Sequence, residues 1–388
     1  MEANAGKLQK IVALLLCKVY YAFPKGRIWV SGSLASNEMT FFKKDEICFM
    51  SDLDVILFVD IPLFLRNFLL KLSENFSKKL TESLNSKGIR THISVNLISP
   101  KISKFITFLQ PNSVYLYEMR PIKMSTYGFD ILSYHVNIKP AKIDCLNLIF
   151  SALADYIFVK FNLANDFPIY EKIYIVAKRY CTLIYSLLLF NGICPRGYMS
   201  TLENAKKHFN SLHGILSQYD IEILEMSTKY KVSGNLYLPV KTSSFKLRDE
   251  TELLSFLSIN FEKLAKKILL YELSEFFGNN GSNLCKSDKC NFHVLNDLLK
   301  KYYSTTKMSI GESLLRFIFN VVSFIINKNN EKLRLEMHLL LKKRHKMCDF
   351  LRYQVCKLFL LTTPQTVVCE NLKQYISIIK KQWDLFMM

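Results

Sequence analysis

The feature that most constrains this chain is a pair of acidic residues, Asp52 and Asp54, at the start of a strongly apolar segment that runs to Val59. In a β-strand, alternate side chains point to opposite faces, so the two carboxylates would share one face. Neighbouring carboxylates repel each other unless a cation lies between them, and hard divalent metals prefer oxygen ligands. The pattern therefore predicts a metal site, although Asp-x-Asp also occurs at ordinary strand edges and turns.

A glycine and a serine, Gly32 and Ser33, directly follow an earlier apolar segment, 28–31. Glycine lets the backbone approach a phosphate closely, and the serine hydroxyl can donate a hydrogen bond to it. The order of apolar strand, Gly-Ser, spacer, paired acids and second apolar strand favours a site for a metal and a triphosphate over an isolated strand edge.

The segments 32–38 (Gly-Ser-Leu-Ala-Ser-Asn-Glu) and 51–54 (Ser-Asp-Leu-Asp) together resemble the signature of the nucleotidyltransferase superfamily that includes DNA polymerase beta. The closer likeness is to the bacterial kanamycin and aminoglycoside nucleotidyltransferases. The resemblance is firm over residues 27–60, looser to about residue 130 and weak over 170–200.

The resemblance implies a reaction and a set of site residues. The reaction is Mg²⁺- or Mn²⁺-dependent transfer of a nucleoside monophosphate from a triphosphate to an acceptor hydroxyl, with release of pyrophosphate. Gly32 and Ser33 would contact the β- and γ-phosphates, and Asp52 and Asp54 would hold the metal. The acceptor stays open among a small sugar-like molecule, an antibiotic, a protein side chain and another nucleotide.

The third carboxylate that the family carries on a later strand is missing from the matching segment, 90–98. The resemblance places it at Ser94 or Asn96, and neither residue is an acid. Asn96 can offer a carbonyl oxygen to a metal, but it cannot act as a general base near neutral pH. Two alternatives to a full metal pair follow: catalysis with one metal and little base assistance, or nucleotide binding without chemistry.

Three residues are candidates for the missing base: Glu118, Asp130 and His92. We expect Glu118 in this role, since the segment Leu116-Tyr117-Glu118 resembles one found in some relatives. An ordinary surface acid is the competing interpretation of Glu118, and His92 also fits a plain strand residue.

The distribution of apolar residues predicts an α+β fold, with a small mixed-sheet catalytic domain over 1–140 and a mostly helical substrate or accessory domain over 141–388. The N-terminal part is expected to contain helices at 7–23, 63–86 and 102–109, strands at 27–33, 51–59 and 90–98, and a long loop at 36–50. Helices are expected afterwards at 143–163, 168–191, 200–218, 250–277, 292–303, 310–327, 330–361 and 364–386.

One lysine of the helical part, Lys178, resembles a residue that reaches back to the triphosphate in many superfamily members. Arg179 is the alternative at this position, and an ordinary surface lysine is the competing interpretation of Lys178.

The amino-acid composition restricts the cellular location and the kinds of binding partner that we expect. The ten cysteines are scattered through apolar runs, which is typical of reduced thiols in a cytoplasmic protein. No apolar stretch approaches the ~20 residues that span a bilayer, so no membrane partner is expected. The net charge of +19 favours polyanionic partners.

The basic run 342–346 could bind RNA, but a solvated helix face is the favoured interpretation, and nucleic acid is not the favoured partner. The competing functions are a nucleotide-binding regulatory or antitoxin-like protein, an oligonucleotide-signal synthase and a basic RNA-binding adaptor.

Overall fold

A computed structural model of the 388-residue chain describes residues 12–19, 21–22, 26–43, 47–49, 51, 53–59, 66–86, 89–90, 92–98, 114–125, 128–132, 139–161, 168–212, 214–233, 245, 247–279, 292–306, 354–356 and 359. The helices expected at 102–109, 310–327 and 364–386 and the basic run 342–346 lie outside these residues, as does the helix expected at 330–361 except for 354–356 and 359. The chain divides into two compact units, 1–138 and 139–388, and each is described by itself.

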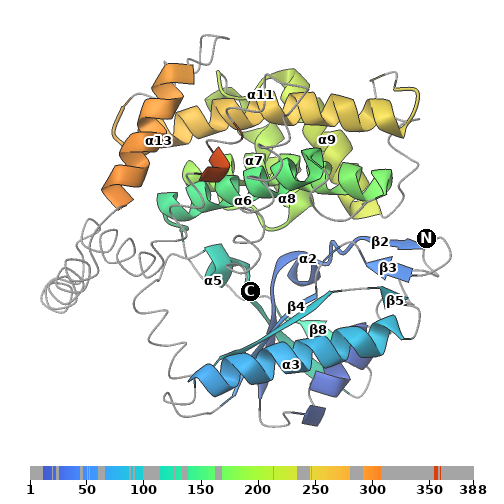
Figure 1. The fold of residues 1–388 in the computed structure, drawn as a ribbon. Coiled ribbons are helices and arrows are strands. Elements are labelled where there is room, and N and C mark those ends of the chain that lie inside the picture. The colour runs from blue at the N-terminus through green and yellow to red at the C-terminus, as the bar shows by residue number, and fades with distance from the viewer. Residues whose placement is uncertain are drawn as a thin grey trace, which may run out of the picture. The chain divides into compact units, whose positions relative to one another are not determined.

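The fold is α+β, with a mixed five-stranded sheet in the first unit and helices throughout the described part of the second (Figure 1). The strand order is β6-β4-β1-β7-β8, in which β4 and β6 are parallel and the other neighbours are antiparallel. The strands are β1 (Arg27–Val30), β4 (Leu53–Phe58), β6 (Ile93–Ile98), β7 (Arg120–Ser125) and β8 (Gly128–Ile131).

One face of this sheet carries the core of the first unit. Alternate residues of β4, namely Leu53, Val55 and Leu57, are fully buried against the helical residues 12–19 and against α3 (Arg66–Asn85), which lies along the sheet in Figure 1. Since side chains alternate across a strand, Asp54 points to the opposite face. The helices and the acidic residue therefore lie on different sides of the sheet.

The outer edge of β6 is covered by hydroxyl side chains from α3. Ser77 Oγ accepts a hydrogen bond from the N–H of Val95 at 2.8 Å, and Thr81 Oγ1 accepts one from the N–H of Ile93 at 3.2 Å. Ser73 donates to the carbonyl of Val95. An edge strand otherwise leaves such groups unpaired, so the hydroxyls at every fourth residue of α3 close this side of the sheet.

Two local predictions for the first unit are wrong. The strand expected over 27–33 ends at Val30, because Gly32 has a positive φ of 59° and begins the short helix α2 (Gly32–Ala35). The loop expected over 36–50 contains two strands, β2 (Phe41–Lys43) and β3 (Ile47–Phe49), which pair with each other and, through β3, with β5 (Ile89–Arg90). Strands of three residues are too short for alternation to identify.

The second unit is built around α7 (Ile169–Phe190), which packs against α6, α8, α9 and α11, while α13 packs against α11. The other helices are α6 (Lys142–Lys160), α8 (Tyr198–Lys207), the 3₁₀ turn η2 (Phe209–Leu212), α9 (Gln218–Ser233), α11 (Glu250–Phe276) and α13 (Phe292–Thr306). Glycine follows two of them: Gly192 after α7 and Gly278 after α11 both have φ of 76°.

Among the described helices, α7 alone is long and apolar enough to cross a membrane by length and composition. The sequence predicts this helix over 168–191 but no apolar stretch of membrane-spanning length, and the second expectation is wrong for α7 by this criterion. The helix lies inside its own unit, where 78% of its apolar window is buried. This is consistent with the core helix of a soluble protein.

Candidate functional site

The site begins at the turn that follows β1. The backbone N–H of Ser31 donates to the carbonyl of Asp54 at 3.2 Å, so the two strands stay paired up to this turn. After the single turn of α2, Asn37 adopts a left-handed conformation with φ of 58°, and the N–H of Glu38 returns to the carbonyl of Ser33 at 2.9 Å. This is the hydrogen-bond pattern of a helix C-terminal cap, and it reverses the chain within six residues.

Gly32 and Asp54 are brought together at this turn. A Cβ atom on Gly32 would lie 3.4 Å from Asp54 Oδ2, which is van der Waals contact. Asp54 is half-buried, and the distance from its carboxylate to this Cβ position places it beside Gly32. Gly32 and Asp54 are thus two predicted site residues that the structure brings together.

Replacing Gly32 by alanine should weaken nucleotide binding at least about tenfold, because the added methyl group occupies the space between the backbone and the Asp54 carboxylate. The positive φ adds a stability cost of about 1–2 kcal/mol. Titration calorimetry with Mg·ATP and urea unfolding measure the two effects. Gly192→Ala is the matched control, since Gly192 has a positive φ but no atom within 4 Å of its Cβ position; equal losses of affinity in both variants would contradict the site.

The chain beyond α2 is attached to the residue that precedes the acid pair. The N–H of Thr40 donates to Ser51 Oγ at 3.0 Å, and both residues are buried, with 1% exposure. Asp52 itself lies outside the described residues, so its place in the site stays a prediction. This buried contact joins Ser51, just before β4, to the segment that follows α2.

On the next strand, the parallel register places Ser94 beside Asp54, and Asn96 beside Ile56. Asn96 is exposed, and its Nδ2 donates to Ser94 Oγ at 3.2 Å. Ser94 is therefore the strand neighbour of Asp54, and Asn96 lies one step further along the same face. The role predicted for Asn96 as a metal ligand remains a prediction.

Glu118 ends the short helix α5 (Val114–Glu118), which leads into β7. Arg120, the first residue of β7, lies opposite Val30 in the sheet, and its guanidinium donates to the carbonyls of Tyr117 and Met119 at 2.9 and 2.8 Å. The topology thus places Glu118 at the end of the sheet where β1 ends and β4 begins. Its predicted role as a base remains open to test.

The other two candidate bases occupy different places. The carbonyl of His92 accepts from the N–H of Leu53 at 3.0 Å, so His92 adjoins the start of β4 and its side chain is exposed. Asp130 lies on the edge strand β8, opposite Lys123, with β1 and β7 between it and β4. With strands spaced about 4.8 Å apart, Asp130 is roughly 14 Å from β4, too far to share a metal with Asp54.

Comparison of the chain with protein families, with curated proteins and with solved structures yields no match. The chemistry of the site therefore rests on its own residues. Within the described part of the chain, no three His, Cys, Asp or Glu side chains are grouped to hold a metal ion, but that set does not include Asp52. Ser94, in register with Asp54, offers a hydroxyl, and Asn96, in register with Ile56 on the same face, offers an amide oxygen. Such oxygen donors suit Mg²⁺.

Lys178 lies on α7 in the second unit, where it is half-buried. Its neighbour Arg179 forms an ion pair with Asp155 of α6, with side-chain exposures of 19% and 30%. Arg179 is thus used within the helical unit, which leaves Lys178 as the better candidate of the two for the triphosphate. That role remains a prediction.

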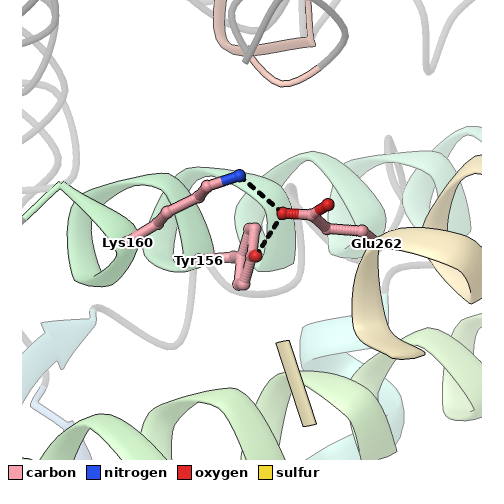
Figure 2. A network of polar contacts seen from close by, with 3 residues as sticks. All are labelled: Tyr156, Lys160 and Glu262. Atoms are coloured by element: carbon pink, nitrogen blue, oxygen red, sulfur yellow. Dashed lines mark hydrogen bonds and ion pairs between the residues drawn. The ribbon is translucent and has the colours of Figure 1, made fainter. Parts of the chain in front are cut away.

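A second polar cluster, at the contact of α6 and α11, joins Tyr156, Lys160 and Glu262 (Figure 2). Both the Tyr156 hydroxyl and the Lys160 ammonium donate to Glu262 Oε1, at 2.5 and 2.7 Å. Burial, together with the Glu262 charge, raises the pKa of Tyr156, so the phenol stays protonated. The cluster therefore joins α6 to α11 through polar contacts.

Proposed function

We propose that this chain is a Mg²⁺-dependent nucleotidyltransferase that moves a nucleoside monophosphate from a triphosphate to an acceptor hydroxyl. The observation that carries the proposal is that the Asp54 carboxylate lies 3.4 Å from the position that a Cβ atom on Gly32 would occupy, at the turn after β1. A carboxylate beside a glycine turn suits a metal-bound phosphate, because the glycine admits the phosphate and the acid holds its cation.

In the proposed reaction the acceptor oxygen attacks the α-phosphorus, the bond from that phosphorus to the pyrophosphate oxygen breaks, and the acceptor proton passes to a base. Asp52 and Asp54 would hold Mg²⁺, which would shield the phosphate charge. Gly32 and Ser33 would bind the β- and γ-phosphates, while Asn96 would offer an oxygen ligand. Glu118 is the proposed base because it lies at the same end of the sheet.

One observation favours a second candidate function. The strand beside β4 offers Ser94 and Asn96 where a third acid would complete a metal pair. A protein of this kind could bind nucleotide without turning it over and act as a regulatory or antitoxin-like protein. We propose a cytoplasmic location for the protein under both candidate functions. If the acceptor is another nucleotide, the product would be an oligonucleotide signal, and the assay described next would detect its synthesis.

The test is release of pyrophosphate from ATP, CTP, GTP or UTP by the full-length protein with Mg²⁺, with and without candidate hydroxyl acceptors. Turnover of at least one nucleotide that stops on addition of EDTA supports the enzyme. Nucleotide binding without turnover under every condition supports the regulatory protein. Neither binding nor turnover, with salt-sensitive affinity for RNA instead, would reject both.

A further inference from the structure

The core of the helical unit contains a carboxyl group that the proposed chemistry does not use. Glu272 of α11 is fully buried, as is Ser186 of α7. Ser186 Oγ lies 3.1 Å from Glu272 Oε1, 3.4 Å from Oε2, and 2.8 Å from the carbonyl oxygen of Cys145 in α6. The three groups thus meet where α6, α7 and α11 pack together.

The hydrogen atoms available at this junction decide the state of the carboxyl group. Ser186 has one hydroxyl hydrogen, and the Cys145 carbonyl can only accept. If that hydrogen goes to the carbonyl, an ionised Glu272 would be buried without a donor. If Glu272 carries its own hydrogen, it donates to Ser186 Oγ, Ser186 donates to Cys145, and every group at the junction is satisfied.

We propose that Glu272 is a neutral carboxylic acid in the folded helical unit, and that loss of its proton to water at alkaline pH loosens the contact of α6, α7 and α11. Two titratable groups of α6 act on Glu272 electrostatically: the Lys142 ammonium and the Cys145 thiol. From α7, the group that contacts Glu272 is the neutral Ser186.

Neither titratable neighbour neutralises an ionised Glu272. Lys142 is exposed and rests over the Phe190 ring, 4.7 Å from its centroid, and within the described residues no ion pair joins Lys142 to Glu272. Burial raises the pKa of Glu272 well above its ordinary value of 4.5 and also raises the pKa of the Cys145 thiol, so burial favours the neutral form of both groups.

The proton on Glu272 links folding stability to pH, and the direction of this dependence can be worked out. A group whose pKa is raised on folding binds its proton more tightly in the native state, so stability is full below the unfolded pKa and falls as the pH rises. Above the ordinary value of 4.5, the unfolding constant of the wild type should rise relative to that of Glu272→Gln by about tenfold per pH unit, until the native carboxyl ionises.

Urea unfolding of the full-length protein and of Glu272→Gln from pH 5 to 9 measures this difference, because glutamine can make the same donation to Ser186 without titrating. Parallel curves, or a wild type that gains stability relative to Glu272→Gln as pH rises, would overturn the proposal. Lys142→Gln is the control: it should have the same effect in both backgrounds, and coupling between the two substitutions would show an ionised Glu272.

Infrared spectroscopy tests the proton directly and does not depend on the folding of any variant. With labelled glutamate, the wild type at pH 7 should show the carbonyl band of one neutral carboxyl group, which disappears as the pH is raised. Absence of that band at pH 7 would overturn the proposal.

Discussion

Replacing Asp54 by asparagine should reduce Mg²⁺-dependent pyrophosphate release by at least about a hundredfold, while leaving the protein folded. Asparagine keeps the size of the side chain but removes the negative charge that would hold the cation beside Gly32. Metal stabilisation of phosphate charge contributes several kcal/mol to such a reaction, and each 1.4 kcal/mol is about tenfold in rate. Initial rates at saturating nucleotide give the comparison.

The matched control for this substitution is Glu74→Gln on α3, since it also converts an acid to its amide but at an exposed position on a helix of the same unit. It should keep the wild-type rate. Thermal unfolding of both variants checks their folding. An Asp54→Asn protein that turns over as fast as Glu74→Gln would exclude Asp54 from the metal site.

The largest loss of stability is expected for Phe261→Ala, at about 3–5 kcal/mol. Phe261 is completely buried in α11, and its ring stacks on Tyr156 of α6 with the centroids 4.5 Å apart. Truncation removes buried apolar surface and leaves a cavity between the two helices, next to the polar contact of Tyr156 with Glu262. Urea unfolding followed by circular dichroism measures the change.

Ile259→Ala is the control for the same helix, because Ile259 is 51% exposed. It should cost less than about 1 kcal/mol, as surface substitutions generally do. Similar losses for the two variants would mean that the face of α11 carrying Phe261 is not the buried one.

The sequence was informative wherever an element was long. The expected helices over 63–86, 143–163, 168–191 and 250–277 correspond to α3, α6, α7 and α11, because apolar residues recur in them at helical spacing over many turns. Gly192 and Gly278 follow the ends of α7 and α11 and adopt the left-handed conformation that a cap requires, so glycine is a helix-end signal at both places.

Short elements near the site could not be predicted in the same way. The single turn α2 depends on the positive φ of Gly32 and on the hydrogen bond from Glu38 to Ser33, and a four-residue helix has no periodicity to detect. Its cap residue, Asn37, is one of the few types that adopt this conformation, and that could have marked the turn.

The register between neighbouring strands could not be predicted from the sequence either. The sequence identified Ser94 and Asn96 as alternatives for the position beside the acids, and only the parallel register shows that Ser94 is the neighbour of Asp54. Likewise, the place of Glu118 at the site end of the sheet follows from the pairing of Arg120 with Val30, which no local pattern predicts.

The most direct test of the account is the position of a bound metal. Crystals of the full-length protein grown with Mn²⁺ and a non-hydrolysable nucleoside triphosphate would locate the ion by its anomalous scattering. The account predicts an Mn²⁺ ion bonded to the Asp54 carboxylate, with phosphate oxygens at the backbone of Gly32 and Ser33. A triphosphate bound elsewhere, with no ion at Asp54, would contradict it.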